Sequence, residues 1–376
     1  MKPYANAFLF IISIIYCGCS ATKPYANSSP ESVPQNRDGN IQWIKVLDHN
    51  STQKTPPAAG EDMAIAFDTQ ENRLILFGGK TDTDSTVSET WIYYPTRNQW
   101  EQLQTSAKNP PPREDHILIY DSHRHKAIMH GGEDGDTSNE LWELDLTSLQ
   151  WESKSDSLVP PLEDHTAEYV TFQKCAYFFG GQNEERPILN DIWKLNLDPE
   201  SPEFYQWSKI EPIAESKRPK ARIYHEMAYD EDRNRLLIFG GWDKIEDEFT
   251  TDTWAFYFET NTWKKIKHKK KKGKFSPSPR RHMTAALDKR RNLWIIFGGD
   301  GEGGPLNDTW AFDLTNDTWK NLTPGPPPRR DHSMLYDANS GEIYMYGGDL
   351  STKKSTEKLH DLWKLNLPDE AESPEL

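Results

Sequence analysis

The chain has few cysteines and no excess of positive charge, and each shortage excludes a class of protein. Three of its 376 residues are cysteines. Cys17 and Cys19 lie near the N-terminus and only Cys175 lies in the body, so a disulfide within the body is excluded. The formal net charge is −15, and no basic stripe with interleaved aromatic residues offsets it. We therefore expect no nucleic-acid partner.

A long apolar run is also missing. The run from Ala7 to Tyr16 follows Lys2; it is too short to span a bilayer but is typical of the core of a signal peptide. Residues 17–20, CGCS, resemble the bacterial lipobox, in which a small residue precedes the cysteine that is lipidated. The resemblance implies cleavage after residues 1–18 and a lipid on Cys19. Because a serine follows the cysteine, it also implies an outer-membrane lipoprotein that faces the periplasm or the cell surface. Tyr16 departs from the Leu-like residue of that motif, so ordinary signal-peptide cleavage and secretion as a soluble protein stay the alternative.

Three polar segments lack the periodicity of folded elements. Residues 19–40 are rich in Ser, Pro and Asn, which is the composition of a flexible tether. Residues 368–376 form a short acidic tail. The lysine-rich run 264–274, KKIKHKKKKGK, lies in the body of the chain. Two interpretations of this run stay open: it binds an anionic partner, or it is a solvated loop.

Aromatic residues and paired glycines, by contrast, are abundant. Aromatic residues make up 12% of the chain and include 14 tryptophans, a mix that favours many short strands. Apolar runs that end in Gly-Gly recur six times, with their first glycines at Gly78, Gly131, Gly180, Gly240, Gly298 and Gly347. A tryptophan follows each pair, at Trp91, Trp142, Trp193, Trp254, Trp310 and Trp363. A second tryptophan follows the first five, at Trp100, Trp151, Trp207, Trp263 and Trp319. A period of roughly 50 residues indicates a repeat protein.

Both features resemble the kelch repeat, and the resemblance covers residues 41–367. It implies an all-β fold, a six-bladed kelch β-propeller with four-stranded antiparallel blades. Each unit reads as an innermost strand a, a strand b that ends at Gly-Gly, a strand c at the first tryptophan and an outer strand d at the second. The sixth repeat lacks its second tryptophan, and Trp43 in IQWIKVL reads as a lone strand d. We predict that this N-terminal strand completes the last blade and closes the ring.

Candidate site residues stand at the start of strand a, where an arginine precedes a histidine by three positions. The copies are Arg113 with His116, Arg222 with His225 and Arg329 with His332; Leu162 replaces the arginine before His165, and Arg280 and Arg281 are shifted next to His282. Because strand a is innermost, we predict that these groups ring the mouth of the central channel, on the face of the d-to-a and b-to-c loops. There they can hold carboxylates or phosphates through charge-assisted hydrogen bonds. A structural role, in which each histidine bonds nearby backbone, is the alternative and suits the repetition.

Acidic residues also recur near these motifs. One stands two positions before the first tryptophan of every repeat, and presence in all six indicates architecture: Glu89, Glu140, Asp191, Asp252, Asp308 and Asp361. Asp115, Asp164 and Asp331 directly precede a histidine, and such a pair can act as acid and base, but nothing singles out one copy. Ligands contributed once per blade stand too far apart for metal bonds of roughly 2 Å. We therefore predict no metal site and no cofactor.

Two functions remain open. The first is a monomeric, non-catalytic module that grips a protein or glycan partner through its loop face. The second is an enzyme similar to the bacterial six-bladed kelch sugar mutarotases. Copper chemistry like that of galactose oxidase needs a Tyr–Cys crosslink and is excluded, because Cys175 lies inside a strand b. An enzyme requires one asymmetric cluster of acid, base and cation, whereas the repeats are nearly symmetric, and this favours binding.

Overall fold

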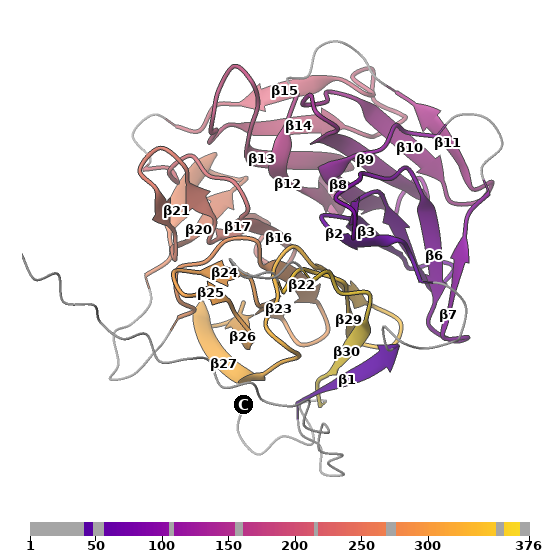
Figure 1. Cartoon of the computed structure of the whole chain (residues 1–376). Helices are drawn as coiled ribbons and strands as arrows, with labels where there is room; N and C mark the ends of the chain where they lie inside the picture. The colour runs from indigo at the N-terminus through magenta and orange to yellow at the C-terminus, as the bar shows by residue number, and fades with distance from the viewer. Residues whose placement is uncertain are drawn as a thin grey trace, which may run out of the picture. The chain divides into compact units, whose positions relative to one another are not determined.

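A computed structural model describes residues 41–47, 56–104, 109–154, 161–213, 217–267, 276–350 and 357–368. In these ranges the chain forms six four-stranded antiparallel sheets, which Figure 1 shows as blades around a central axis. The only helical segment among the described residues is a 3-10 turn, η1 (Thr171–Gln173). The predicted all-β class and six-bladed propeller are confirmed.

The strands of each blade follow one another outward as strands a to d, and the a strands of neighbouring blades contact each other around the axis. The first three blades are β3 (Ala64–Asp68), β4 (Arg73–Phe77), β6 (Thr90–Tyr94) and β7 (Gln99–Gln102); β8 (Glu114–Asp121), β9 (Lys126–Glu133), β10 (Leu141–Asp145) and β11 (Gln150–Ser153); and β12 (Glu163–Val170), β13 (Cys175–Gln182), β14 (Ile192–Asn196) and β15 (Trp207–Ile210). The last three are β16 (Glu226–Asp230), β17 (Arg235–Phe239), β20 (Thr253–Tyr257) and β21 (Thr262–Lys265); β22 (Thr284–Asp288), β23 (Leu293–Phe297), β26 (Asp308–Asp313) and β27 (Thr318–Pro324); and β28 (Ser333–Asp337), β29 (Glu342–Tyr346), β30 (Leu362–Asn366) and β1 (Gln42–Leu47).

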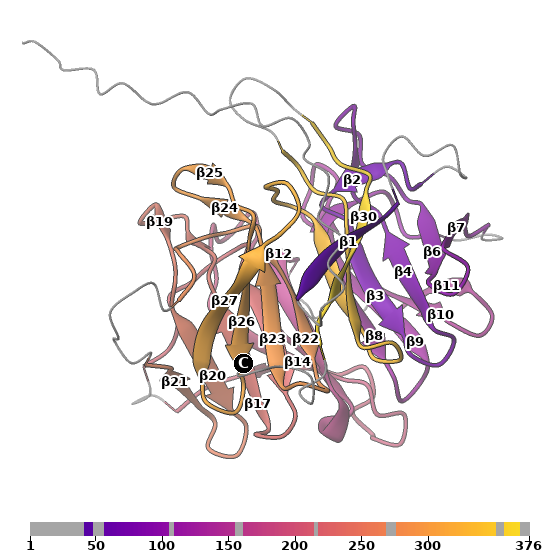
Figure 2. The ribbon, with the colours of Figure 1, turned by 90° about the horizontal axis from the view of Figure 1, so that it is seen from below.

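The N-terminal strand closes the ring, as predicted. Strand β1 pairs antiparallel with β30, and Trp43 stands opposite Leu365. Figures 1 and 2 both show the indigo β1 beside the yellow β30. The indole Nε1 of Trp43 donates to Thr309 Oγ1 of the fifth blade at 2.9 Å. One strand therefore joins the two ends of the propeller and supplies the fourth strand of the last blade.

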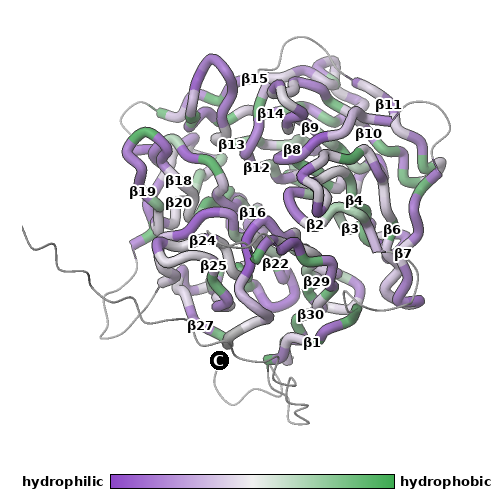
Figure 3. The backbone as a smooth tube through the Cα atoms, in the orientation of Figure 1, coloured by the Kyte–Doolittle hydropathy of each residue, from purple (hydrophilic) through white to green (hydrophobic). Residues whose placement is uncertain are grey.

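The paired tryptophans fill the contacts between blades. Six hydrophobic clusters each combine residues of two neighbouring blades, and the tryptophan pair of a blade lies in the cluster toward the preceding blade. Trp142 and Trp151 of the second blade, for example, pack with Phe77 of the first. Figure 3 shows that the hydrophobic stretches run along the strands, whereas the connecting loops are largely hydrophilic. Aromatic packing therefore stabilises the contact between neighbouring blades at every boundary.

The Gly-Gly pairs allow close approach between blades. Both glycines of each pair have positive φ, for example 68° at Gly78 and 92° at Gly79. The amide of Gly79 donates to the carbonyl of Arg113 in the next blade at 2.9 Å. A Cβ on Gly78 would lie 2.6 Å from that carbonyl oxygen. Glycine is therefore required both for the backbone conformation and for the space.

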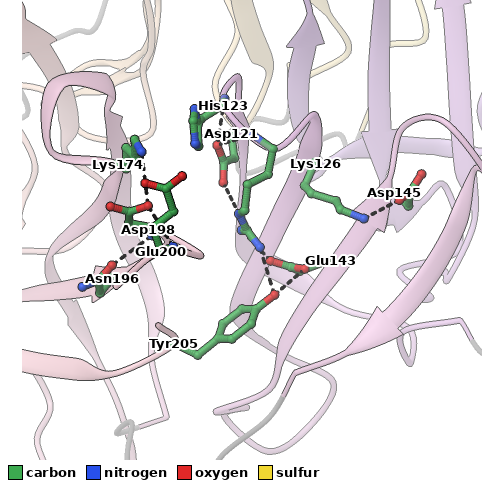
Figure 4. Close-up of polar contacts among 11 residues, drawn as sticks. Asp121, His123, Lys126, Glu143, Asp145, Lys174, Asn196, Asp198, Glu200 and Tyr205 are labelled. Carbon is green, nitrogen blue, oxygen red and sulfur yellow. Dashed lines mark hydrogen bonds and ion pairs between the residues drawn. The ribbon is translucent and has the colours of Figure 1, made fainter. Parts of the chain in front are cut away.

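A long turn of the third blade reaches back to the second blade (Figure 4). The Tyr205 hydroxyl donates to Glu143 Oε2 at 2.7 Å and accepts a hydrogen bond from Arg124 Nη1 at 2.9 Å. Arg124 also pairs with Asp121 and Glu143, both at 2.6 Å. The insertion that interrupts the regular tryptophan spacing in this repeat therefore strengthens a blade boundary.

The predicted flanking segments lie outside the described residues. This applies to the signal peptide, to the tether including Cys19, to the acidic tail beyond residue 368 and to most of the lysine-rich run. Among the described residues, no helix has the length and apolar character needed to span a bilayer.

Candidate functional site

The four predicted arginines lie inside the blades rather than at the channel mouth. Their exposed fraction is at most 3%: Arg113, Arg222, Arg280 and Arg329. In each case Nη1 donates to the carbonyl of the first glycine of the same blade at 2.8–3.0 Å, as Arg329 does to Gly347. Each guanidinium also pairs with the acidic residue two positions before the first tryptophan, and Arg329 and Asp361 are 2.6 Å apart.

These acidic residues have a second structural partner. Asp361 Oδ2 accepts the indole N–H of Trp363 at 2.7 Å, and four other blades repeat the contact. Burial raises the pKa of Asp361, but the charge of Arg329 and the hydrogen bonds from Arg329 and Trp363 together outweigh burial and hold the pKa below its usual range. The architectural interpretation of the acidic residues is confirmed. For the arginines, the geometry favours a structural role over ligand contact.

Four of the five predicted histidines are buried at the blade boundaries. The exposed fractions of His116, His165, His225 and His332 do not exceed 7%. The ring of each packs against the first glycine of the preceding blade, as His116 does against Gly78. Burial lowers the pKa of His116, His165 and His332 to about 3, so these imidazoles are neutral at physiological pH. The four nevertheless line a cavity at the channel mouth.

The fifth copy of the motif lies in a different register from the one predicted. Arg280 is not shifted, because it bonds the carbonyl of Gly298 just as Arg113 bonds that of Gly131, 18 residues away in both cases. Met283 therefore occupies the histidine position and packs against Gly240. His282 stands one residue earlier than the other four histidines of the motif, and it lines the same cavity at the mouth. Because Arg280 and Arg281 are adjacent in PRRH, the sequence alone does not show which of them occupies the arginine position of the motif.

The residue just before the histidine position forms a ring of six at the channel mouth. Its members, one from each blade in order, are Asp62, Asp115, Asp164, Tyr224, His282 and Asp331. All six have φ between 53° and 57°, a left-handed conformation that is uncommon for Tyr and His. Backbone hydrogen bonds join neighbouring blades at this level: Asp331 N to His282 O at 3.1 Å, His282 N to Tyr224 O at 3.2 Å and Asp62 N to Asp331 O at 3.1 Å.

This ring lies on the face of the d-to-a and b-to-c loops, as predicted for the mouth. The two sets of loops bond each other, for example Arg222 N to Leu189 O at 3.0 Å. Three two-stranded sheets in this region pair β2 (Ala59–Glu61) with β5 (Lys80–Thr81), β18 (Trp242–Asp243) with β19 (Glu248–Phe249) and β24 (Asp300–Gly301) with β25 (Gly304–Pro305). Figure 2 shows β2, β19, β24 and β25 on one side of the propeller. We call this side the loop face.

Half of the ring is acidic and desolvated. Burial, followed by the charges of neighbouring carboxylates, raises the pKa of Asp62, Asp115 and Asp164 well above the usual range. Glu163 lies next to Asp164, and burial together with the charge of Glu133 raises its pKa to about 7. Like charges that share a poorly solvated site resist ionisation. This half therefore favours protonation or a bound cation.

The other half of the ring is internally paired. Asp331 Oδ1 accepts from the Nδ1 of His282, and the ring of His282 stacks on Tyr224 with centroids 3.6 Å apart. Burial raises the pKa of Asp331, but the His282 and Arg330 charges outweigh it and lower the pKa. The ring is thus asymmetric, in contrast to the near-symmetry of the sequence motif.

Two cavities meet just below the ring, at the start of the a strands. The cavity at the mouth has a volume of about 160 Å³ and is lined by all six ring residues. The second, of about 630 Å³, continues along the channel between the a strands and shares His116, His165, Thr166 and Glu226 with the first. Burial raises the pKa of Glu168 in this channel to about 7. The mouth can therefore accommodate a small polar group or the tip of a side chain.

One set of carboxylates meets the distance criterion for a metal site among the described residues. Oxygen atoms of Glu61, Asp331 and Asp349 lie within 4.8 Å of one another. Lys358 pairs with Glu61 at 2.9 Å, and Arg330 pairs with Asp349 at 2.9 Å. The cluster is therefore part of an ion-pair network, in which basic side chains already neutralise the carboxylates.

Comparison with known proteins supports the kelch assignment. Residues 164–371 match the KLHDC2/KLHL20/DRC7 Kelch-repeats domain, and residues 74–209 match the Attractin/LZTR1 beta-propeller. The chain belongs to the kelch-repeat family. Propellers of this family are typically protein-interaction modules.

Similar kelch proteins come from fungi and animals. The chain is 26% identical over 345 residues to Mei4-dependent protein 6 of Schizosaccharomyces pombe, covering 81% of the chain and 47% of the relative. It is 24% identical over 330 residues to Kelch domain-containing protein 10 of Xenopus tropicalis, covering 83% and 76%. It is 21% identical over 320 residues to the Leucine-zipper-like transcriptional regulator 1 homolog of Drosophila melanogaster, covering 82% and 31%. The chain thus spans about half or less of the length of the yeast and fly relatives.

Asp62 and Tyr224 are the site residues that the sequence motif missed. Asp62 precedes Met63, and Tyr224 follows Ile223, so neither stands in an Arg/Asp/His pattern. Counting back a constant distance from the first glycine of each Gly-Gly pair would have aligned both with Asp115. These two residues could therefore have been predicted from their spacing to the Gly-Gly pair, but not from their residue types.

Proposed function

We propose that the propeller binds a partner protein through its loop face. The observation that carries this is a cluster on the β18–β19 hairpin, beside the mouth, in which the half-buried aromatic residues Trp242 and Phe249 flank an exposed isoleucine. Ile245, at its tip, has 68% of its surface exposed. The guanidinium of Arg281 lies 4.5 Å from the ring centre of Trp242 and 4.9 Å from that of Phe249. Trp and Arg are enriched among residues that dominate protein interfaces.

An affinity purification with matched variants tests this proposal. The loop-face bait carries Trp242→Ala and Ile245→Asp, and the control bait carries Phe172→Ser. Phe172 has 81% of its surface exposed and lies in η1, between strands a and b, on the opposite face. We expect the loop-face bait to lose partners that the wild-type and control baits retain. Loss from the control bait alone would overturn the proposal. A glycan ligand is detected in the same experiment by analysing the bound carbohydrate.

The asymmetric ring favours one alternative, a sugar mutarotase-like activity. Anomer exchange requires an acid and a base at one site. The His282–Asp331 pair faces aspartates of raised pKa across the same small cavity. NMR detection of anomer exchange over a panel of reducing sugars tests this activity, with His282→Gln as the comparison. No acceleration on any sugar rejects it.

We also propose export and lipid attachment at Cys19. Support comes from the apolar run and the CGCS sequence alone. The fungal and animal relatives give no support for location at a bacterial outer membrane, and secretion as a soluble protein stays the alternative. Cys19→Ala should release the protein from membranes, whereas unchanged membrane retention would reject the anchor. The monomeric state likewise stays a prediction.

A further inference from the structure

Three carboxylates of the ring have no ion-pair partner of their own among the described residues, although the charge of Lys80 acts on Asp62 and Asp115 from a distance. Within the part of the chain that the structure describes, none of Asp62, Asp115 and Asp164 forms an ion pair. The carboxylates one position earlier do, since Glu61 pairs with Lys358 at 2.9 Å and Glu114 pairs with Lys80. Both lysines are thus engaged outside the ring, and Arg330 pairs with Asp331 in its other half. The acidic half keeps an uncompensated charge, or holds protons in its place.

Unpartnered polar atoms line the same cavity. Asp164 has 7% of its surface exposed, and its Oδ2 accepts from Gln182 at 2.7 Å; its Oδ1 has no donor within hydrogen-bond distance among the described residues, although the Tyr224 hydroxyl lies near enough to lower the pKa of the carboxyl group. The neighbouring His165 has 5% exposed, and its Nδ1 is also without a partner in the described part of the chain. Leaving a buried polar atom unpaired typically costs about 1–3 kcal/mol. A ligand that donates hydrogen bonds at this point would recover that free energy.

The three aspartates are too far apart to coordinate one small metal ion together. Their oxygen atoms do not fall within 4.8 Å of one another, the spacing that only Glu61, Asp331 and Asp349 reach among the described residues. Calcium needs its oxygen ligands at about 2.3–2.6 Å. A guanidinium group carries five donors on three nitrogen atoms and can bridge more widely spaced acceptors, while an ammonium group, with three donors on one nitrogen, can bind one or two of the aspartates.

The cavity also suits the size and shape of such a group. Its volume is about 160 Å³, whereas one water molecule needs roughly 10–15 Å³ of such space. The stacked rings of Tyr224 and His282 form the wall opposite the acidic half. Aromatic faces attract cations. Arg330 and Arg281, the nearby positive groups, are paired with Asp349 and Asp300 respectively.

We propose that the partner inserts a lysine or arginine side chain into the cavity between Asp62, Asp115 and Asp164. This inference rests on the proposed loop-face binding and adds the chemistry of the ligand. It reverses the expectation from the arginine motif, which pointed to carboxylates or phosphates. The buried arginines bind carbonyls and acidic residues inside the blades, and the charged groups that line the cavity are mainly carboxylates.

Peptide display on the immobilised full chain tests the proposal. Three proteins are compared: the wild type, the double variant Asp115→Asn with Asp164→Asn, and the control Asp232→Asn. Asp232 is an exposed aspartate in the turn between β16 and β17, away from the cavity. Asparagine keeps the side-chain shape and tolerates positive φ, and thermal unfolding confirms that each protein is folded.

We expect the wild type and the control to select peptides enriched in lysine or arginine. A selected peptide should bind the double variant at least about tenfold more weakly, which corresponds to about 1.4 kcal/mol. Replacing its basic residue with norleucine should weaken binding to the wild type equally. Peptides that lack basic residues, or that bind the double variant unchanged, would overturn the inference. If such peptides still require Trp242 and Ile245, loop-face binding stands without it; if they require neither, both proposals fail.

Discussion

Arg329 donates to Gly347 and pairs with Asp361 while exposing none of its surface. A conspicuous cation in the sequence therefore contributes no charge to the surface beside it. Asp115, which stands in the same short motif of another blade, does face the cavity. At the scale of single residues, burial decides which charge a ligand meets.

Arg329→Ala tests the structural role of the motif arginines. The change leaves Asp361 buried beside Trp363 without its cation, and breaking a buried ion pair typically costs about 3–5 kcal/mol. We expect a loss of that size in the free energy of unfolding, measured by urea denaturation. Arg97→Ala, at an exposed ion pair, is the control and should change stability by less than about 1 kcal/mol. Unchanged stability of Arg329→Ala would instead favour a ligand-binding role.

Asp115→Asn tests the desolvation of the ring. Burial and the neighbouring Asp164 raise the pKa of Asp115 in the folded state, so its charged form destabilises the fold. The penalty is absent below the ordinary pKa near 4 and grows as pH rises toward the folded-state value. We expect Asp115→Asn to be more stable than the wild type at pH 8 and equal to it near pH 3.5, by urea denaturation at both pH values. Lower stability of the variant at pH 8 would contradict the account.

Strand β1 shows how one element carries the closure of the ring. Trp43 packs with Phe297 and Met345 and bonds Thr309, which places it between the fifth and sixth blades. Trp43→Ala should therefore lower the free energy of unfolding by about 3–5 kcal/mol. Ile44→Ala, on the half-buried opposite face of the strand, is the matched control and should cost less. Equal effects of the two substitutions in thermal unfolding would argue against closure through this strand.

The repeating elements were predictable because each carries several coincident signals. Gly-Gly, the two tryptophans and the acidic residue recur together, and even the lone Trp43 could be placed by the absence of its partner in the last repeat. The ring was only partly predictable. Asp115, Asp164 and Asp331 were visible as residues next to a histidine, but Asp62, Tyr224 and the true place of His282 required the register of the blades.

On the scale of the whole molecule, six similar blades surround an asymmetric mouth. The first three blades contribute aspartates, and the last three contribute the stacked Tyr224 and the His282–Asp331 pair. The repetition determines the positions of the six side chains, and the differences between blades determine the charge that the mouth presents. The sequence motif predicts the positions of the side chains. It does not predict the charge of the mouth, because the arginines that dominate the motif are buried.

Binding of a cation at the mouth can be measured directly, because it should change the NMR signals of the carboxyl carbons of the aspartates. With ¹³C-aspartate in the full chain, NMR can follow Asp62, Asp115 and Asp164 during titrations with butylammonium, butanol and butyrate, which share one carbon chain. We expect butylammonium to shift these three signals and to lower the pKa of their carboxyl groups, while butanol and butyrate leave them unchanged. Shifts caused by butyrate and absent with butylammonium would contradict cation binding at the mouth.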